Sequence, residues 1–284
     1  MTTAFVLSGG ASLGAIEVGM LQTLIGRGIR PDLVVGTSVG ALNGAWLAGG
    51  SSDADLRDLA DLWRGLKRSA VFPAGLLTGF TGFVGLRNHL VSNRAIKRLL
   101  ETHLRFERME DAPIPLHVIA ADVLTGKDVR LSTGPAVDAV TASAALPGIL
   151  PPVVIDGRAL MDGGVVNNTP ISHAIELGAT TVWVLPTGYA CTLSKVPGSA
   201  LGMGLLGVTL AINQRLALDI ERYESVADVR VVPPLCPLDT SPADFGDADE
   251  LITRAREQTA KWLDEAPVEV GQADLLLPHR HRHR

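Results

Sequence analysis

Short apolar runs alternate along this chain with longer segments in which apolar residues recur at helical spacing. Short runs bounded by Gly, Pro or Asp are typical of buried strands, and recurrence every three to four residues is typical of helices. The runs predict strands or strand hairpins at residues 4–8, 32–36, 115–133, 151–164, 180–187 and 227–234. The helical spacing predicts helices at residues 12–28, 39–50, 53–68, 92–104, 135–146, 169–179, 201–223 and 247–263.

The repeated order of strand, turn and helix predicts the fold class. Strands that alternate with helices build a mainly parallel sheet that is covered on both faces. We therefore expect a three-layer α/β fold made by a single domain over residues 1–275. Residues 276–284 end in HRHRHR and are expected to form a disordered His/Arg tail.

Two segments have a distinctive local pattern. In the helix at 169–179, Thr169 is expected to cap the N-terminus and Pro170 to take the first helical position. Residues 71–91 are rich in Gly and Phe and show no clean period, which predicts a loop or a loosely helical cap beside a site. Residues 71–91 and the apolar stretch Leu201–Ile212 either pack in the ordinary way or shape a groove for an apolar ligand.

Composition and charge limit the classes of function. Of the 284 residues, 46% are hydrophobic and 19% are charged, so the chain can bury a sizeable core. The net charge of −5 argues against a broad nucleic-acid surface, and no nucleic-acid partner is expected. The pattern does not predict an oligomeric state.

The N-terminal sequence, the longest apolar stretch and the cysteines indicate the cellular compartment. The N-terminus MTTAFVLSGG lacks the features of a secretory signal, and Leu201–Ile212 is much shorter than the ~20 residues of a membrane span. Cys191 and Cys236 form neither a metal-ligand pattern nor a disulfide framework, and we expect two inert thiols. These features predict a soluble cytoplasmic protein that is able to touch a membrane surface peripherally.

Ser38 lies in a five-residue turn motif. The sequence GTSVG places Gly36 two residues before it and Gly40 two residues after it, between a predicted strand and a predicted helix. Such an elbow projects the serine hydroxyl from the carboxyl edge of a sheet, next to the positive end of the following helix. The motif predicts either a nucleophile or a purely structural tight turn.

A second glycine turn, LSGGASLGA, follows the first strand. It lacks the Gly spacing of a dinucleotide site and the Lys and Ser/Thr of a phosphate loop. The backbone N–H groups of Gly9, Gly10 and Ala11 are candidates for an oxyanion hole that serves Ser38. The alternative is a packing turn between strand and helix.

A serine nucleophile needs a base. Of the seven histidines, three lie in the tail, and none of His89, His103, His117 and His173 lies in a glycine-rich loop where a triad histidine would be expected. Asp162, in MDGGVVNN, directly precedes two glycines, and a carboxylate held near a serine hydroxyl can itself accept the proton. The alternative for Asp162 is an ordinary Asp-Gly turn.

Taken together, three segments make the chain resemble the patatin-like phospholipases over roughly residues 3–264. These segments are LSGGASLGA, GTSVG and the long stretch around MDGGVVNN. The resemblance implies that Ser38 is a nucleophile, that Asp162 is its partner in a dyad without histidine, and that residues 9–11 form the oxyanion loop. It further implies hydrolysis of lipid acyl esters, such as phospholipid or lysophospholipid, through an acyl-serine, with no metal and no organic cofactor.

The chain departs from the family pattern at two positions. Ala11 stands where a third glycine is usual, and Leu13 stands where a basic residue is usual. These departures put the rate and head-group preference in question more than the type of reaction. The alternatives are a soluble carboxylesterase or thioesterase acting on short acyl chains, and a catalytically silent binding module of the same fold.

Overall fold

The computed structural model describes residues 1–67, 88–188, 196, 198, 200–238, 240–242 and 244–265. Most of the predicted Gly- and Phe-rich segment and the entire His/Arg tail lie outside these residues. The predicted end of the domain at residue 275 also lies outside them, so the domain boundaries stay a prediction.

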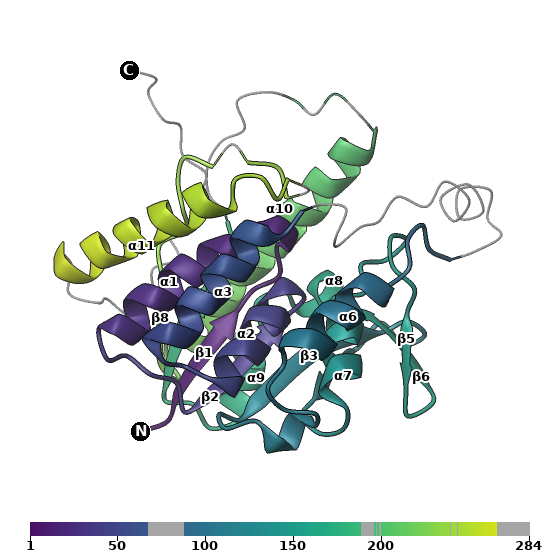
Figure 1. The fold of residues 1–284 in the computed structure, drawn as a ribbon, viewed down its shortest axis with the longest axis horizontal. Coiled ribbons are helices and arrows are strands. Elements are labelled where there is room, and N and C mark those ends of the chain that lie inside the picture. Colours follow the sequence, from purple (N-terminus) through teal and green to yellow (C-terminus); the bar gives the residue numbers. More distant parts are fainter. Residues whose placement is uncertain are drawn as a thin grey trace.

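One eight-stranded sheet forms the centre of the fold (Figure 1). Its strand order is β5-β6-β3-β2-β1-β7-β8, with β4 paired to β3. Strands β3, β2, β1, β7 and β8 are parallel, whereas β4, β5 and β6 join antiparallel at one side. The strands are β1 (Thr3–Leu7), β2 (Leu33–Thr37), β3 (Leu116–Asp122), β4 (Asp128–Leu131), β5 (Val153–Ile155), β6 (Arg158–Asp162), β7 (Thr181–Leu185) and β8 (Asp228–Val231).

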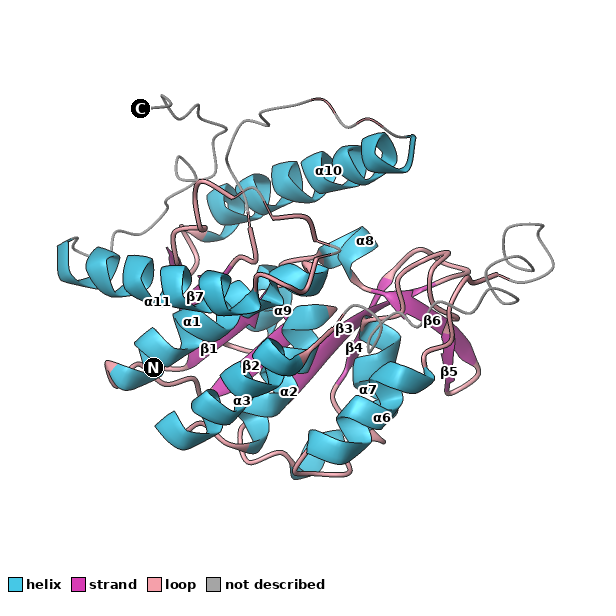
Figure 2. Cartoon of the chain, turned by 45° about the horizontal axis from the view of Figure 1, so that its top comes forward, coloured by secondary structure: helices cyan, strands magenta, loops and turns pink. Residues whose placement is uncertain are grey.

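Helices cover both faces of this sheet, as Figure 2 shows. The described helices are α1 (Gly14–Gly26), α2 (Val39–Gly49), α3 (Asp53–Gly65), α6 (Arg94–His103), α7 (Ala136–Ser143), α8 (Gly164–Asn167), α9 (Ile171–Glu176), α10 (Ala200–Tyr223) and α11 (Ala248–Glu265), with 3-10 turns at Ala11–Leu13 and Met109–Asp111. Alternate residues of β1 face opposite sides: Phe5 and Leu7 pack with α1, α2, α3, α6, α7 and α11, and Ala4 and Val6 pack with α9 and α10. The predicted three-layer, mainly parallel α/β fold is confirmed.

Both predicted hairpins are confirmed. Strand β3 pairs antiparallel with β4, and β5 pairs antiparallel with β6. The second hairpin turns at Asp156 and Gly157, whose φ angles of 50° and 75° fit a tight turn in which both central residues are left-handed.

The predicted cap of the helix at 169–179 is wrong in detail. Helix α9 begins at Ile171, and Pro170 is its N-cap without a side-chain cap bond. The carbonyl of Thr169, not its hydroxyl, accepts the N–H of Ile171 at 2.8 Å. Pro170 has a ψ of 57°, outside the helical range, so the first helical position falls one residue later than the sequence suggested.

The expectation of two inert thiols is wrong for Cys236, which is disulfide-bonded. No free cysteine occurs in the described part of the chain. The cysteines therefore no longer support the expected reduced, cytoplasmic compartment.

Candidate active site

The strand register brings Ser38 and Asp162 to the same level of the sheet. Thr37, the last residue of β2, pairs with Ile119 of β3, and Asp162, the last residue of β6, pairs with Ala120 of β3. Strand β3 lies between β2 and β6 in the sheet order. Ser38 and Asp162 therefore emerge on either side of one strand, although they are 124 residues apart.

Because Gly163 has no side chain, the segment after β6 can pass close to β3. A Cβ added to Gly163 would lie 2.3 Å from the carbonyl oxygen of Ile119. Any side chain at this position would push the segment and Asp162 away from Ser38. Gly163, the first glycine of the Asp-Gly-Gly sequence, thus lets Asp162 lie close to Ser38.

The elbow at Ser38 is strained and well supported. Its φ of 56° and ψ of −123° are unusual for a residue with a side chain, a conformation that costs roughly 1–3 kcal/mol. The Ser38 N–H donates to the hydroxyl of Ser143 at 2.8 Å, and that hydroxyl donates to the carbonyl of Ile119 at 2.6 Å. These bonds tie the turn to β3 and α7, and hold the Ser38 side chain in one direction.

The flanking glycines are required by the packing of the elbow. A Cβ at Gly36 would lie 2.4 Å from the carbonyl oxygen of Gly40, and a Cβ at Gly40 would lie 2.4 Å from the carbonyl oxygen of Leu7. Both contacts are with backbone, which cannot rotate away. Gly36 and Gly40 thus allow the close backbone packing that the elbow motif predicts.

The Ser38 hydroxyl donates a hydrogen bond to Asp162. Its Oγ lies 2.6 Å from Oδ2, and Oδ1 accepts the backbone N–H of Gly164 at 2.7 Å. Asp162 is 3% exposed, and burial raises the pKa of its carboxyl to about 6, against smaller lowering effects of the bonds from Ser38 and Gly164. The carboxylate is therefore fixed in direction and more basic than an exposed aspartate.

The glycine loop after β1 lies beside Ser38, but its three residues are not equivalent. The N–H of Gly9 donates to the carbonyl of Asn168 at 3.1 Å, so this amide is already engaged. A Cβ at Gly9 would lie 2.3 Å from the Asn168 side-chain oxygen and 3.1 Å from the Cβ of Ser38. The need for glycine here is one of space, and the geometry does not favour the Gly9 amide as an oxyanion donor.

Gly10 and Ala11 keep their N–H groups available. Neither amide donates to any other residue in the part of the chain that the structure describes. A Cβ at Gly10 would lie 2.1 Å from the hydroxyl of Thr187, and Thr187 in turn donates to the carbonyl of Gly9 at 2.7 Å. Ala11 has a φ of 52°, which costs an alanine about 1 kcal/mol and explains why glycine suits this position better.

Of the described histidines, His103 lies against the Trp46 ring, and the other three have their own partners or surroundings. His173 contacts Asp128 at 2.9 Å, and His89 contacts Asn88 at 2.9 Å. His117 lies in β3, and burial followed by the charge of Arg130 lowers its pKa to about 4. Among the described residues, the partner of the Ser38 hydroxyl is Asp162.

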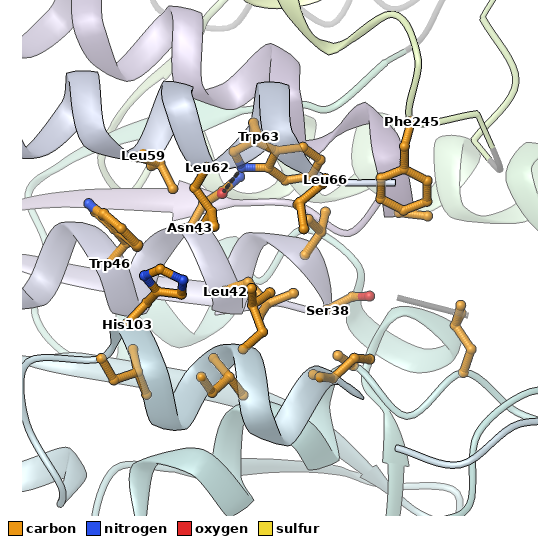
Figure 3. Close-up of a pocket in the computed structure, with 18 residues that line it drawn as sticks. Ser38, Leu42, Asn43, Trp46, Leu59, Leu62, Trp63, Leu66, His103 and Phe245 are labelled. Atoms are coloured by element: carbon orange, nitrogen blue, oxygen red, sulfur yellow. Dashed lines mark hydrogen bonds between the residues drawn. The ribbon is translucent and has the colours of Figure 1, made fainter. Parts of the chain in front are cut away.

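An apolar pocket extends from Ser38 between α2, α3 and α6, as Figure 3 shows. Its lining includes Leu42 of α2, Leu62 of α3 and Leu100 of α6, its cavity volume is about 80 Å³, and part of it is open to solvent. The described lining residues do not include any from Leu201–Ile212, which favours ordinary packing or exposure for that stretch.

A buried polar network stands behind one wall of the pocket. The Asn43 side chain donates to the carboxyl of Glu17 at 2.8 Å and to the carbonyl of Gly14 at 2.9 Å, and accepts the indole N–H of Trp63 at 2.9 Å. Complete burial raises the pKa of Glu17 well above its usual range, against smaller lowering effects of its hydrogen bonds. The network holds the Trp63 ring against the pocket.

Sequence reasoning missed several supporting residues. Asn168, Thr187 and Ser143 position the glycine loop and the elbow, and Asn43 and Glu17 form a buried pair between α2 and α1. A polar residue in an otherwise apolar helix, such as Asn43, was the available signal. The other partners come from distant segments and carry no local pattern.

The fold and the site together define a class of α/β proteins built around a serine on a strand-to-helix elbow and a hydrogen-bonded aspartate. A model described as patatin-like phospholipase matches residues 5–175, and the chain belongs to this family.

Curated relatives are much longer proteins. Patatin-like phospholipase domain-containing protein 7 of Rattus norvegicus is 33% identical over 195 residues, which are 65% of this chain and 13% of the relative. Lysophospholipase NTE1 of Mycosarcoma maydis is 28% identical over 239 residues, which are 81% of this chain and 12% of the relative. The chain thus matches about one eighth of their length. Among solved structures, VipD from Legionella pneumophila covers 93% of this chain, at 15% identity and a TM-score of 0.49 over 66% of its own length.

Proposed function

We propose that the chain is a serine acyl hydrolase that cleaves carboxylic ester bonds of lipids, with phospholipid or lysophospholipid as the substrate class. One observation carries the proposal: the Ser38 hydroxyl donates to Asp162 at 2.6 Å where the site meets an apolar pocket. Membership of the patatin-like phospholipase family and a relative named as a lysophospholipase support the substrate class.

In the first step of the proposed mechanism, Asp162 accepts the Ser38 proton as Oγ attacks the ester carbonyl carbon. A carboxylate can act as this base because its pKa of about 6 leaves it ionised near pH 7 and more basic than a free aspartate. The bond from the Gly164 N–H keeps Oδ1 in place, so Oδ2 faces the hydroxyl.

The negative charge on the carbonyl oxygen is then stabilised by backbone N–H groups. The unengaged amides of Gly10 and Ala11 are the proposed donors, and the N-terminus of α2, which directly follows Ser38, adds its positive end. Gly9 is assigned a packing part in this proposal because its amide donates to Asn168.

Collapse of the tetrahedral intermediate breaks the ester carbon–oxygen bond, and the leaving alcohol takes the proton from Asp162. Asp162 next accepts a proton from water as the water oxygen attacks the acyl carbon. The bond to Oγ breaks, and Ser38 regains its proton from Asp162 as the carboxylic acid forms. The sequence consumes one water per ester and uses no redox or metal-dependent step.

A panel of substrates tests this function. We expect the wild-type protein to release fatty acid from lysophospholipid and phospholipid, with Ser38→Ala inactive on both. Measurement of the released acids by mass spectrometry would give the products. Turnover confined to short-chain esters or thioesters would support the short-chain esterase instead, and an inert Ser38 would support a silent binding module.

Part of α10 has the surface chemistry of a membrane contact, and we propose that it touches a lipid surface. Residues 200–214 contain no charged residue, and Met203, Val208 and Leu210 are 48%, 48% and 52% exposed. Figure 1 shows this end of α10 projecting from the body of the fold. Within the described residues, no helix has the length and apolarity needed to cross a bilayer.

The membrane contact predicts the behaviour of charged variants. The double variant Val208→Asp/Leu210→Asp is expected to bind phospholipid vesicles roughly tenfold more weakly, because two apolar side chains no longer enter the lipid. A matched control is Leu218→Asp, since Leu218 is 61% exposed on the same helix but lies among charged residues. Vesicle co-sedimentation is the measurement, with hydrolysis of a monomeric ester unchanged in all variants. Equal losses in the double variant and the control would refute the contact.

A further inference from the structure

The apolar pocket has a defined far end. At this end the Trp46 ring lies against the His103 ring, with centroids 5.8 Å apart, and Figure 3 shows both rings on the side of the pocket away from Ser38. A second pocket, with a more polar lining, shares Trp46, Leu62, His103 and Leu104 with the first. The two rings, with Leu62 and Leu104, therefore lie between an apolar space that begins at Ser38 and a more polar one that does not contain it.

Helix geometry sets the distance between Ser38 and this end. Ser38, Leu42 and Trp46 follow one another at intervals of four residues, so they lie along one face of α2, and all three line the pocket. A rise of 1.5 Å per residue places Trp46 roughly 12 Å along the helix from Ser38. Figure 3 shows the lining residues spread along α2 from Ser38 to Trp46.

The Trp46 ring is held in place. Its indole N–H donates to the carbonyl of Asp55 in α3 at 2.9 Å. His103, at the last residue of α6, stands against the ring. Contacts from three helices thus fix an aromatic wall across the pocket, and swinging it aside would break a hydrogen bond that spans α2 and α3.

The space beyond the wall suits water better than hydrocarbon. Its lining includes Asp58, Asp61, Thr102 and Arg105. An acyl chain that extended past Trp46 would move from an apolar lining to one with charged side chains. Its additional carbons would therefore gain little binding free energy from burial.

We propose that Trp46, backed by His103, is the end wall that sets the length of acyl chain the pocket accepts. The proposal rests on the proposed function, in which the acyl carbon bonds to Ser38 Oγ. An extended chain advances somewhat less per carbon than the carbon–carbon bond length of about 1.5 Å, so roughly eight to ten carbons span the distance to Trp46. Chains beyond this length meet the indole.

The experiment compares hydrolysis of monomeric p-nitrophenyl esters whose acyl chains run from about four to about sixteen carbons. Each methylene that enters an apolar site adds at most about fourfold to kcat/KM. For the wild-type protein, kcat/KM is expected to rise with length and to stop rising at roughly eight to ten carbons. For Trp46→Ala the rise is expected to continue for several more carbons, which increases the ratio of long-chain to medium-chain kcat/KM at least about tenfold.

Three further variants sharpen the comparison. Trp46→Leu keeps an apolar side chain but shortens the wall, and is expected to shift the maximum less than Trp46→Ala does. His103→Ala removes only the ring that supports Trp46, so the chain length of the maximum is expected to shift less than in Trp46→Ala. Leu42→Ala is the matched control: it widens the middle of the pocket on the same helix face and should leave the position of the maximum unchanged. The ratio between chain lengths does not depend on the fraction of folded enzyme, so modest destabilisation does not obscure it.

The outcomes separate the two proposals. A maximum at the same chain length in the wild type and in both Trp46 variants would overturn the end wall while leaving the hydrolase intact. An equal shift in Leu42→Ala would also overturn it, since any enlargement would then suffice. Failure of the folded wild-type protein to hydrolyse any ester would instead overturn the proposed function, and the end wall with it.

Discussion

Replacing Ser38 with alanine is expected to lower kcat/KM for an ester substrate by roughly 10⁴–10⁶-fold and to abolish labelling by a fluorophosphonate probe. The reason is that the Ser38 hydroxyl is the proposed nucleophile, and alanine has no hydroxyl to attack the ester carbon or to donate to Asp162. Steady-state hydrolysis and gel-based labelling measure the two effects. Peptide mapping of the labelled wild-type protein should place the adduct on Ser38.

Ser143 provides a matched control for this prediction. Its hydroxyl also lies at the elbow, but it accepts the Ser38 N–H and donates to a β3 carbonyl. Ser143→Ala should therefore slow labelling moderately, by loosening the turn, without abolishing it. Undiminished labelling of Ser38→Ala would show that another residue is the nucleophile.

Replacing Asp162 with asparagine is expected to lower kcat/KM by roughly 10³–10⁴-fold, because an amide can still accept a hydrogen bond but cannot take up the Ser38 proton. In the wild-type protein, kcat/KM should fall about tenfold per pH unit below about pH 6, where the Asp162 carboxyl becomes protonated. The pH dependence of hydrolysis of a monomeric ester measures this. A residual activity of Asp162→Asn near the wild-type level would contradict the role of the carboxylate.

The same substitution should increase stability. The pKa of Asp162 is raised from 3.8 to about 6 on folding, mainly by burial, so the folded state loses stability as pH rises through this range and the carboxyl ionises. An asparagine avoids this cost. The free energy of unfolding of Asp162→Asn should exceed that of the wild type by about 1–3 kcal/mol above about pH 7, and the difference should disappear as pH falls below about 4.

Asp122 is the matched control for the stability effect, with the opposite sign. Bonds from the N–H groups of Thr125 and Leu124 lower the pKa of its carboxyl. Its contribution is therefore present above its unfolded pKa and lost as pH falls through the lowered folded value. Asp122→Asn should destabilise the protein at neutral pH, and denaturant unfolding at several pH values distinguishes the two variants.

The order of strands and helices could be predicted because local patterns determine it. The apolar runs around Phe5 and Val35 and the helical spacing after Gly14 are complete within single segments. The elbow glycines could also be predicted, since Gly36 and Gly40 belong to a turn motif whose steric requirements are local. Segments whose structure depends on nearby residues are therefore well predicted by sequence alone.

Contacts between distant segments could not be predicted in the same way. The amide of Gly9 matches the oxyanion pattern but is taken by Asn168, which is 159 residues away. The end wall needs Trp46 and His103 from two helices that only the tertiary fold brings together. Likewise, the spacing of the two cysteines gave no indication that Cys236 is disulfide-bonded.

The central claim is that Asp162 accepts the Ser38 proton without imidazole. A pH profile alone does not test it, because histidine also titrates near pH 6.5. The most direct measurement is the pH dependence of the rate of Ser38 phosphonylation in Asp162→Asn beside the wild type, since Asp162 is the described partner of the Ser38 hydroxyl. We predict that the wild-type inflection near pH 6 disappears in Asp162→Asn and that the rate falls roughly 10³–10⁴-fold. An inflection near pH 6 that persists in Asp162→Asn, at a rate within about tenfold of wild type, would show that another group is the base and contradict the claim.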